Sequence, residues 1–311
     1  MNNKDMESIC IIAEEGNITR AAKRLFIAQS SLSQCIQRVE QEFGVTLFIR
    51  TKTGIELTDA GHIFIDTAEK AGKLFRDLEN SFADLNQLMF GHLIVGIPAL
   101  LSSYLLPEYL IQFCQRYPNI ELETLEADNN RLELLLQRGK IDLAISSNEA
   151  TDSFDQTPIL ASDMIVVAPE WFKPGDAVDP VTGILDLRAL EGQPFIMYQK
   201  KQKLYEITEK ILGKANVHVR TVLYTSSSKG GILYSVNGLG FSLQPEISYL
   251  FHKPLLNGKG KIYRIANEYT EPWRIIVKQS KNGYYSRASQ AFTKELQEFY
   301  ADYPFSGPIH R

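Results

Sequence analysis

Residues 28–44, AQSSLSQCIQRVEQEFG, combine a polar beginning with an apolar stripe at helical spacing. The stripe recurs at steps of four, three and four residues, through Leu32, Ile36, Val39 and Phe43. Gly44 follows where a left-handed residue commonly ends a helix. Serine in a helix body is mildly unfavourable, because its hydroxyl competes for nearby backbone groups. The polar side chains of the first turns therefore indicate hydrogen bonds to an external partner; they are Gln29, Ser30, Ser31, Ser33 and Gln34.

A shorter helix is predicted just before this stretch. Thr19 can cap a helix over residues 20–26, in which the small Ala21 and Ala22 would let a second helix cross closely. Two short helices joined by a tight turn, the second polar at its outer end, describe a helix-turn-helix. Glutamine can bond to the N6/N7 edge of adenine and serine to several base edges, so we predict that residues 28–44 read double-stranded DNA. The alternative is a solvated helix in some other small helical domain.

Basic side chains surround the predicted pair of helices. Six lie between residues 20 and 55, against two acidic ones. They include Arg20, Arg24 and Arg50, which are placed for phosphates, and phosphate contacts fix register without reading sequence. Residues 51–57, TKTGIEL, form a turn between two short extended segments, as in a wing beside the minor groove. The predicted DNA-binding residues are Gln29, Ser30, Ser31, Ser33, Gln34, Arg38, Arg50, Lys52 and Thr53.

A long helix is predicted next, because Thr58 can cap it and Asp59 is favourable in its first turn. Its apolar residues recur with alternating steps of four and three, a seam of period 3.5. At 1.5 Å per residue a helix over residues 58–88 would be about 46 Å long, and it could not stay folded with this seam in water. We predict a coiled-coil dimer, with packing along the chain's own domain as the alternative. The seam consists of Phe64, Ala68, Ala71, Phe75, Leu78, Phe82, Leu85 and Met89.

From Gly91 onward, strands alternate with helices. HLIVGI, IELETLE and IDLAIS read as strands of a first unit, and DMIVVAP, PFIMY, VHVRTVLY and GFSLQP as strands of a second. This alternation predicts α/β lobes with parallel sheets and helices on both faces. A strand over residues 273–277 and a helix over residues 286–300 are expected to return to the first lobe. Lobe I would then comprise residues 90–161 and 268–311, and lobe II residues 162–267.

Polar side chains gather where these strands end. In an α/β sheet the ligand crevice lies at the carboxyl ends of the strands, and helix N-termini pointing there favour an anion such as a carboxylate. Lys200 or Arg131 could add positive charge. Ser102 and Ser226 could instead simply cap helices, and this alternative stays open. The predicted effector-binding residues are Ser102, Ser103, Asn129, Ser146, Tyr198, Gln199, Lys200, Ser226 and Ser228.

Composition narrows the class of protein. The 311 residues are 44% hydrophobic and 23% charged, with a net charge of −4, as in a globular protein of two or three domains. Three scattered cysteines fit a reducing cytoplasm, and no apolar run has the length of a signal peptide or a membrane span. The five histidines lack metal-ligand spacing, and no P-loop or complete nucleophile elbow occurs. We therefore expect no enzyme, no catalytic residue, no metal, no cofactor and no membrane partner.

Residues 19–61 resemble the winged helix-turn-helix of the LysR-type transcriptional regulators. The likeness continues in LLQRGKIDLAIS and VNGLGFSLQPE, within a domain whose two lobes resemble type 2 periplasmic binding proteins. It implies DNA, a small-molecule effector and RNA polymerase as partners, and a dimer through the linker helix that assembles into a tetramer. The matching residues are Ala21, Ala22, Leu25, Gln29, Ser33, Ile36, Val39, Glu40, Gly44, Leu47, Phe48, Arg50, Leu57, Thr58, Ala60 and Gly61.

Four positions depart from the family pattern or stand out from it. Ala28 occupies a position usually held by a serine, which removes a capping bond of typically ~1 kcal/mol. Gln34 and Gln37 occupy positions that are often basic, which weakens the expected phosphate contacts. Cys35, beside the reading face, is interpreted as an inert, partly buried thiol rather than a redox group, because no basic cluster would lower its pKa.

The sequence therefore predicts a cytoplasmic, LysR-type, DNA-binding transcriptional regulator. Its fold class would be α/β, with a winged helix-turn-helix at residues 1–58, a linker helix at 59–89 and a two-lobed effector domain at 90–311. The alternative is a metabolic enzyme or a solute-binding lobe pair with a helical oligomerisation region.

Overall fold

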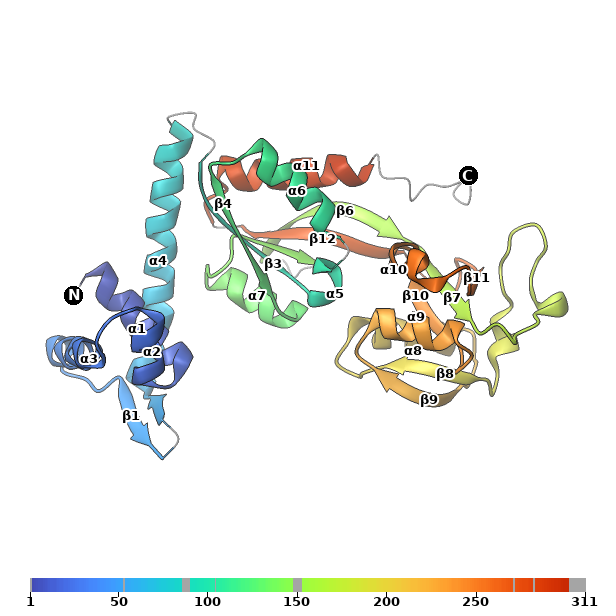
Figure 1. Ribbon diagram of the computed structural model, residues 1–311, viewed down its shortest axis with the longest axis horizontal. Coiled ribbons are helices and arrows are strands. Elements are labelled where there is room, and N and C mark those ends of the chain that lie inside the picture. Colours follow the sequence, from blue (N-terminus) through green and yellow to red (C-terminus); the bar gives the residue numbers. More distant parts are fainter. Residues whose placement is uncertain are drawn as a thin grey trace.

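A computed structural model describes residues 2–52, 54–85, 90–103, 105–147, 153–270, 272–281 and 283–301. Three parts follow one another along its longest axis (Figure 1). A small N-terminal domain stands at one end, a long helix connects it to lobe I in the middle, and lobe II lies at the other end. Thr53, from the predicted wing, and Met89, from the predicted seam, lie outside the described residues.

The N-terminal domain packs three helices against a two-stranded wing. The wing strands are antiparallel, and Phe48 pairs with Leu57 at one end and Thr51 with Gly54 at the other. A buried apolar core joins the helices, with Ile9, Ala21 and Leu32 all fully buried. The elements are α1 (Asn3–Glu15), α2 (Ile18–Arg24), α3 (Gln29–Phe43), β1 (Phe48–Thr51) and β2 (Gly54–Leu57).

The caps of these helices partly differ from the prediction. Asn17, not Thr19, caps α2, and its side chain accepts hydrogen bonds from the backbone N–H groups of Thr19 and Arg20. Asparagine is at least as good a cap as threonine, and it sits one position before the helix. Gly44 ends α3 in the left-handed conformation, at φ 67°, which confirms that prediction. Ala28 begins α3 without a side-chain cap.

The apolar stripe of α3 is buried only over its first part. Leu32, Ile36 and Val39 are buried as predicted, but Phe43 is 52% exposed. Its ring meets the edge of the Phe64 ring, with the two centroids 6.3 Å apart. Phe43 is the last residue of α3, and its side chain lies outside the buried core of the N-terminal domain. Cys35 takes a place in the buried face instead.

The long helix α4 (Asp59–Leu85) begins as predicted, because the Thr58 hydroxyl accepts a hydrogen bond from the Gly61 N–H at 3.0 Å. The predicted seam divides into two parts along this helix. Phe64 and Ala68 pack into the core of the N-terminal domain, so this end of the seam follows the alternative of packing within the chain. The later part is exposed, including Phe75, Phe82 and Leu85.

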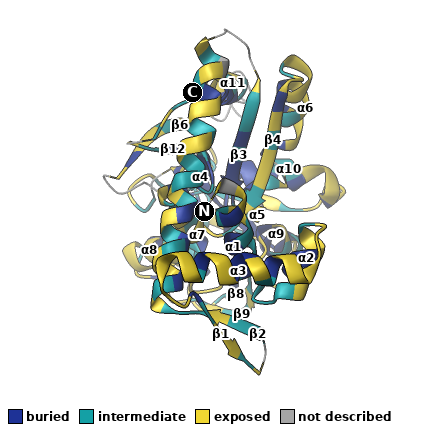
Figure 2. Ribbon diagram, turned by 90° about the vertical axis from the view of Figure 1, so that its left-hand side faces the viewer, coloured by how far each residue is buried: buried dark blue, intermediate teal, exposed yellow. Residues whose placement is uncertain are grey.

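Lobe I is a five-stranded mixed sheet with helices on both faces. Its strand order is β4-β3-β5-β12-β6, in which β3 pairs in parallel with β4 and β5, while β12 runs antiparallel to β5 and β6. β3 is largely buried and the edge strand β4 is largely exposed (Figure 2). The elements are β3 (Gly91–Ile97), α5 (Ala99–Ser102), α6 (Pro107–Arg116), β4 (Ile120–Glu126), α7 (Asn129–Gln137), β5 (Leu143–Ser146), β6 (Phe154–Ser162), β12 (Trp273–Ser280) and α11 (Arg287–Ala301).

Lobe II contains two small sheets rather than one parallel sheet. In the first, β10 and β11 both run antiparallel to β7, and in the second β8 and β9 are parallel. A bridge between Phe195 and Phe241 connects the two sheets. The elements are β7 (Met164–Ala168), β8 (Pro194–Tyr198), α8 (Lys203–Lys214), β9 (Arg220–Thr225), α9 (Ser228–Val236), β10 (Ser242–Pro245), α10 (Glu246–His252) and β11 (Lys261–Arg264), with 3-10 turns at Gly175–Ala177, Leu187–Leu190 and Lys253–Leu256.

The expectation of parallel sheets was wrong in part in both lobes, because β12 runs antiparallel to β5 and β10 antiparallel to β7, although all four were predicted as strands. Strands β6 and β11 were also not predicted. Pro158 sits inside β6, where a proline argues against a central strand. β6 tolerates this proline because β6 is the edge strand of the sheet and because the register shifts at this point, opposite Ile275 and Ile276.

Among the described residues, no helix is long and apolar enough to cross a membrane.

Lobe I also contacts the N-terminal domain directly. Lys140, just after α7, donates a hydrogen bond to Glu14 of α1 at 3.2 Å and lies 3.4 Å from Glu69 of α4. Burial opposes its charge, but Glu69 and Glu14 more than offset this and raise the pKa of Lys140. Arg76 of α4 donates to the carbonyl of Gly139 beside it. The turn after α7 is therefore held by two elements from the N-terminal side.

Candidate DNA interface and ligand pocket

The outer face of α3 is open and polar, whereas its inner face is buried (Figure 2). Gln29, Ser30, Ser31 and Gln34 are exposed, and Ser33 is half-buried at the edge of this face. Unengaged amide and hydroxyl groups in this arrangement can bond to base edges. The helix follows α2 after a tight turn, as a recognition helix does in a helix-turn-helix.

Arg38, farther along α3, is an ion-pair partner of Asp5. Asp5 belongs to a capping box with Asn2 at the start of α1 and also accepts a weak hydrogen bond from the Cys35 thiol at 3.6 Å. Burial raises the pKa of Cys35, and the Asp5 carboxylate raises it further. A thiol kept protonated is a poor nucleophile, which supports the interpretation of Cys35 as structural. Arg38 remains 60% exposed and can still meet a phosphate.

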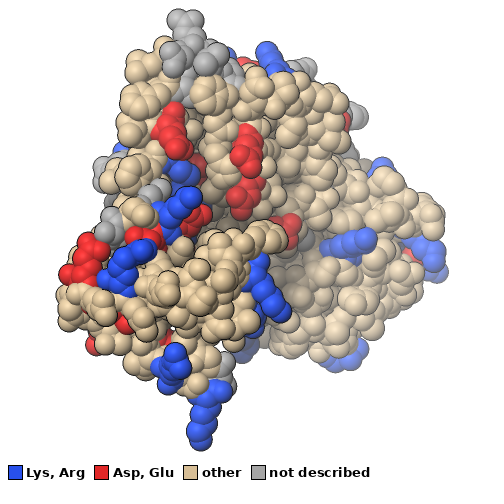
Figure 3. All heavy atoms as spheres, turned by 60° about the vertical axis from the view of Figure 1, so that its left-hand side comes forward, with Lys and Arg blue, Asp and Glu red and all other residues tan. Residues whose placement is uncertain are grey.

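The wing supplies exposed positive charge. Arg50 and Lys52 are exposed at the tip of β1, and Lys and Arg side chains mark the lowest point of the molecule in Figure 3. Arg24, in contrast, is paired with Glu14 at 2.9 Å and Glu15 at 3.2 Å, and Arg20 lies 3.7 Å from Glu15. Because α1 neutralises these two arginines, the wing is the stronger candidate for phosphate contacts.

Replacing Gln34 and replacing Arg50 should have different effects on DNA binding. Gln34→Ala is expected to weaken binding to the correct operator by ~1–3 kcal/mol and to relax sequence preference at one position, because a base contact is lost. Arg50→Ala should weaken all sequences alike and reduce the slope of log K against log salt by about 0.9, since one phosphate contact is lost. Fluorescence anisotropy with operator and scrambled duplexes at several salt concentrations measures both.

Gln41→Ala is the matched control, because Gln41 is an exposed glutamine at the far end of α3. It should leave both affinity and preference unchanged. An unaltered sequence preference in Gln34→Ala would reject the assignment of this side chain to a base.

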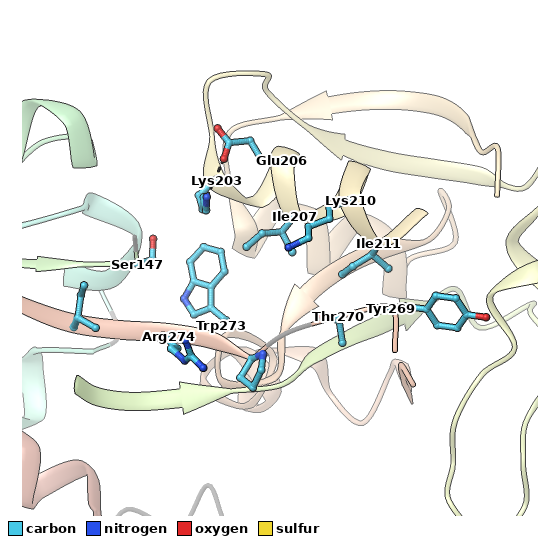
Figure 4. A pocket seen from close by; sticks show the side chains of 12 residues that line it. Ser147, Lys203, Glu206, Ile207, Lys210, Ile211, Tyr269, Thr270, Trp273 and Arg274 are labelled. Atoms are coloured by element: carbon cyan, nitrogen blue, oxygen red, sulfur yellow. Dashed lines mark hydrogen bonds and ion pairs between the residues drawn. The ribbon is translucent and has the colours of Figure 1, made fainter. Parts of the chain in front are cut away.

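A pocket of about 470 Å³ lies between the two lobes (Figure 4). Lobe I contributes Ser147 after β5 and the beginning of β12, and lobe II contributes one face of α8. Such a volume is within the usual range for a small organic ligand. The lining residues are Ser147, Lys203, Glu206, Ile207, Lys210, Ile211, Tyr269, Thr270, Pro272, Trp273, Arg274 and Ile276.

Of the four predicted effector residues of lobe I, Asn129 and Ser146 are bonded to each other. Asn129, the first residue of α7, accepts a hydrogen bond from the Ser146 hydroxyl at 3.0 Å and donates one to Ser147 at 3.3 Å. Ser147, the neighbour of the predicted Ser146, is the residue that reaches the pocket. Ser102 donates to the carboxylate of Glu126 and to the Ala99 carbonyl, and Ser103 is exposed.

Two predicted effector residues of lobe II are instead in its interior. Tyr198 is fully buried and accepts a hydrogen bond from Gln244 of β10. Ser228 is fully buried too and bonds to Gln244 at 2.7 Å and Ser248 at 2.6 Å. The missing side chain of Gly231 makes room, since a Cβ there would come 2.9 Å from the Tyr198 hydroxyl. These groups connect α9, α10 and the strands, and neither Tyr198 nor Ser228 lines the pocket.

The remaining predicted residues of lobe II are on exposed loops. Gln199, Lys200 and Ser226 are exposed where β8 and β9 end. Gln202 holds these two loops together, because its side chain donates to the Ser226 carbonyl at 2.8 Å and accepts from the Gln199 N–H at 3.2 Å. The described lining of the pocket includes none of the nine predicted residues.

Sequence reasoning missed the pocket residues on α8 and β12. A signal was present in α8, where Lys203, Ile207 and Lys210 recur at steps of four and three and so share one helix face. Trp273 was assigned only as a strand residue. Its place in the pocket depends on the crossing of the chain between the lobes, which no local pattern reveals.

Comparison with known proteins decides the family. Residues 86–301 match the LysR substrate binding domain, and residues 3–62 match the bacterial regulatory helix-turn-helix of the lysR family. The chain belongs to the LysR family. This result confirms the predicted DNA-binding transcriptional regulator with an N-terminal helix-turn-helix and an α/β effector domain. The HTH-type transcriptional regulator YcgK of Bacillus subtilis is 28% identical to this LysR-family chain over 312 residues, covering 96% of this chain and 94% of YcgK.

Solved structures of LysR-family regulators share the fold. A full-length OxyR variant from Pseudomonas aeruginosa is 20% identical with a TM-score of 0.71, covering 96% of this chain and 95% of OxyR. Full-length CbnR in complex with its target DNA is 19% identical with a TM-score of 0.53, covering 96% and 99% of the two chains. Both similarities extend over nearly the entire length of this LysR-family chain.

Proposed function

We propose that this LysR-family regulator binds its operator as a homodimer and changes its activity when a small ligand enters the pocket between lobes I and II. The observation that carries this proposal is the pocket itself, which is lined from both lobes and is large enough for a small organic molecule. A ligand touching both lobes stabilises one relative arrangement of them, and it shifts the population of that arrangement by its differential affinity.

The assembly is part of the same proposal. The exposed seam on α4 joins two chains, and two dimers associate into the tetramer. Operator DNA is the direct partner, as it is for CbnR in its DNA complex, and RNA polymerase is the partner through which transcription changes. The protein works in the bacterial cytoplasm and catalyses no reaction. The alternative of a metabolic enzyme or solute-binding lobe pair is not favoured, because residues 3–62 match a regulatory helix-turn-helix.

Two measurements on the full chain test this function. Duplex fragments from the chromosome surrounding its own gene should be shifted by the purified protein, and the shift should weaken with rising salt as phosphate contacts are lost. A metabolite panel in a thermal-shift assay should contain a compound that raises Tm as RT ln(1 + [L]/Kd) and also changes the DNA shift. Absence of any DNA shift at low salt would overturn the function, and a stabilising metabolite without influence on DNA would overturn its regulation by the pocket.

A further inference from the structure

Helix α4, which connects the N-terminal domain to lobe I (Figure 1), contacts lobe I with its polar side. Five polar residues of this helix recur at steps of four, three, four and four, so at about 100° per residue they share one side. The exposed seam residues from Phe75 to Leu85 are on the opposite side. α4 thus presents its polar side to lobe I and leaves its apolar side exposed. The polar residues are Glu69, Lys73, Arg76, Asn80 and Asp84.

Charged groups of the two parts meet at the 138–140 turn, which follows α7 and consists of Arg138, Gly139 and Lys140. The Lys140 ammonium group lies 3.2 Å from the Glu14 carboxylate of α1 and 3.4 Å from the Glu69 carboxylate of α4. A Cβ on Gly139 would overlap with the Lys73 side chain, so α4 lies directly against this turn. Lys140 therefore joins lobe I to both α1 and α4.

The charges at this contact are incompletely satisfied. The Glu69 side chain is 8% exposed, and its Oε2 is buried without a hydrogen-bond partner among the described residues, since Arg138 approaches it only to 3.9 Å. The Arg76 Nε atom is likewise buried without a hydrogen-bond partner in the described part of the chain. Water would bond to both atoms if α4 separated from lobe I, which partly offsets the loss of the ion pairs. A polar contact of this kind between two parts of one chain can open, and a ligand can shift its equilibrium.

The 138–140 turn is joined rigidly to the last turn of α7. The Gly139 N–H donates to the Leu136 carbonyl at 3.1 Å and the Lys140 N–H to the Leu135 carbonyl at 2.8 Å, which are the two bonds of a Schellman motif. Gly139 has the left-handed conformation that this motif needs, at φ 67°. The leucines of α7 pack in a small buried cluster of their own and not in the main core of the lobes. A displacement of α7 is therefore also a displacement of the 138–140 turn.

The other end of α7 is at the pocket between the lobes. Asn129, its first residue, accepts a hydrogen bond from Ser146 at 3.0 Å and donates one to the Ser147 hydroxyl at 3.3 Å. Ser147 lines the pocket. α7 has nine residues, so its two ends are about 13 Å apart. A ligand that bonds to Ser147 would compete with Asn129 for this hydroxyl and displace the start of the helix.

We infer that Lys140 is the positioning residue through which the pocket controls the DNA-binding domain, and that α7 connects the two. This inference rests on the proposed function, since it names the path of regulation for the same pocket. With the 138–140 turn in place, Glu14 and Glu69 hold α1 and α4 against lobe I. When α7 shifts, Lys140 leaves these carboxylates, and the helix-turn-helix is released from lobe I together with α4, which is part of its core.

The first experiment uses Cys10 of α1 as a reporter of this contact. Cys10 is 8% exposed and lines a groove of about 380 Å³ to which lobe I contributes Lys140. Separation of the 138–140 turn uncovers this thiol, so Lys140→Glu should raise its rate of alkylation by iodoacetamide roughly three- to thirtyfold in the full chain. Peptide mass spectrometry measures all three cysteines. Cys35, buried in α3, reports unfolding of the N-terminal domain, and Cys114, exposed on α6, reports the rate of an open thiol.

The direction of this change separates opening from electrostatics. Burial raises the pKa of Cys10 to about 11, whereas the positive charge of Lys140 acts to lower this pKa. Lys140→Glu removes the lowering, so in a contact that stayed closed the thiolate fraction and the rate would fall. Lys140→Arg keeps the charge and should react like the unchanged chain. Lys294→Glu, at an exposed lysine of the same lobe, is the matched control and should leave the Cys10 rate unaltered.

The second experiment tests the connection through α7. Asn129→Ala removes the bonds to Ser146 and Ser147 and should change the affinity for operator DNA at least roughly threefold, measured by fluorescence anisotropy. In a Lys140→Met background the same replacement should have no effect, because the 138–140 turn no longer holds α1 and α4. Ser147→Ala is a milder change that keeps the bond between Asn129 and Ser146, and its effect should depend on Lys140 in the same way. Asn237→Ala, on an exposed residue after α9, should have no effect in either background.

Unchanged or slower alkylation of Cys10 in Lys140→Glu would overturn the inference. Equal acceleration of Cys10 and Cys35 would contradict the release of an intact domain, and equal effects of Asn129→Ala in both backgrounds would remove α7 as the connection. These outcomes are independent of the proposed function. A protein that shifts operator DNA and responds to a metabolite would remain a regulator without a role for Lys140, whereas absent DNA binding would remove the function itself.

Discussion

Replacing Phe75 and Phe82 together by glutamate is expected to separate the proposed dimer and to weaken operator binding by roughly a hundred- to ten-thousandfold. Both side chains are on the exposed part of α4, at 48% and 57% exposure, beside Leu78 at 47% and Leu85 at 78%. Apolar side chains at this spacing are stable in water only against a partner, and a charge buried there without a counter-ion costs several kcal/mol. Both half-sites can then no longer be held at once.

Sedimentation velocity measures the mass and anisotropy with a two-half-site duplex measures the affinity. Val181→Glu with Leu255→Glu is a suitable control, because these residues are 91% and 54% exposed and lie in lobe II, far from α4 (Figure 1). The control should sediment and bind like the unchanged protein. If the Phe75 and Phe82 variant kept its mass and its operator affinity, the exposed seam would not be the dimer interface.

The second large effect is expected from a buried charge in lobe I. Lys278, in the middle of β12, has a fully buried side chain whose ammonium group lies 2.5 Å from the Glu133 carboxylate on α7. Glu133→Ala would leave this charge without a counter-ion, which destabilises a protein by ~3–5 kcal/mol. For a domain of this size that corresponds to a decrease in Tm of roughly 6–20 °C. Differential scanning calorimetry of the full chain, with its transitions assigned by domain, measures it.

Two control variants test whether the unpaired charge of Lys278 causes this loss of stability. The double change Glu133→Leu with Lys278→Met replaces both charges by apolar groups of similar size, and it should recover most of the lost stability. Glu298→Ala breaks an exposed pair in the same lobe, between Glu298 at 63% and Lys294 at 76% side-chain exposure, and should change the free energy of unfolding by less than about 1 kcal/mol. A decrease in the double variant as large as in the single variant would contradict the explanation by an unpaired charge.

Local rules predicted those elements whose cause is local. The Gly44 end and the Thr58 cap depend on residues within one or two turns, and both are present. The α3 stripe is present as far as Val39.

One error was local, since Asn17 and not Thr19 caps α2. The other errors arose where distant segments decide the structure. Strand β6 was not predicted because it contains Pro158, and a proline is acceptable there only because β6 pairs with β12 at the edge of the sheet. Phe64 and Ala68 fit a dimer seam by spacing, yet the core of the N-terminal domain lies against them.

The same limit applies to the pocket. Strand ends indicated a region next to the pocket, since Ser147, which lines it, directly follows the predicted Ser146. Tyr198 also ends a strand, but its hydroxyl points into the lobe and bonds to Gln244. Gly231 on α9 leaves room for it there, because it has no side chain. A strand end therefore does not determine the direction of its side chain. The contribution of Trp273 depends on where the chain crosses between lobes, and that crossing is a property of the complete fold.

The missing cap at Ala28 has a consequence for the motions of the recognition helix. No described side chain accepts a hydrogen bond from the first turn of α3, so this turn is expected to open locally more often than the turns around Leu32 and Val39, whose side chains are buried. The opening turn is the one that carries Gln29, Ser30 and Ser31. On DNA, a phosphate oxygen at the helix start can take the place of the absent cap. Part of the ordering of the reading surface then occurs only on contact with DNA, and its amide protons become protected from exchange with solvent at the same moment.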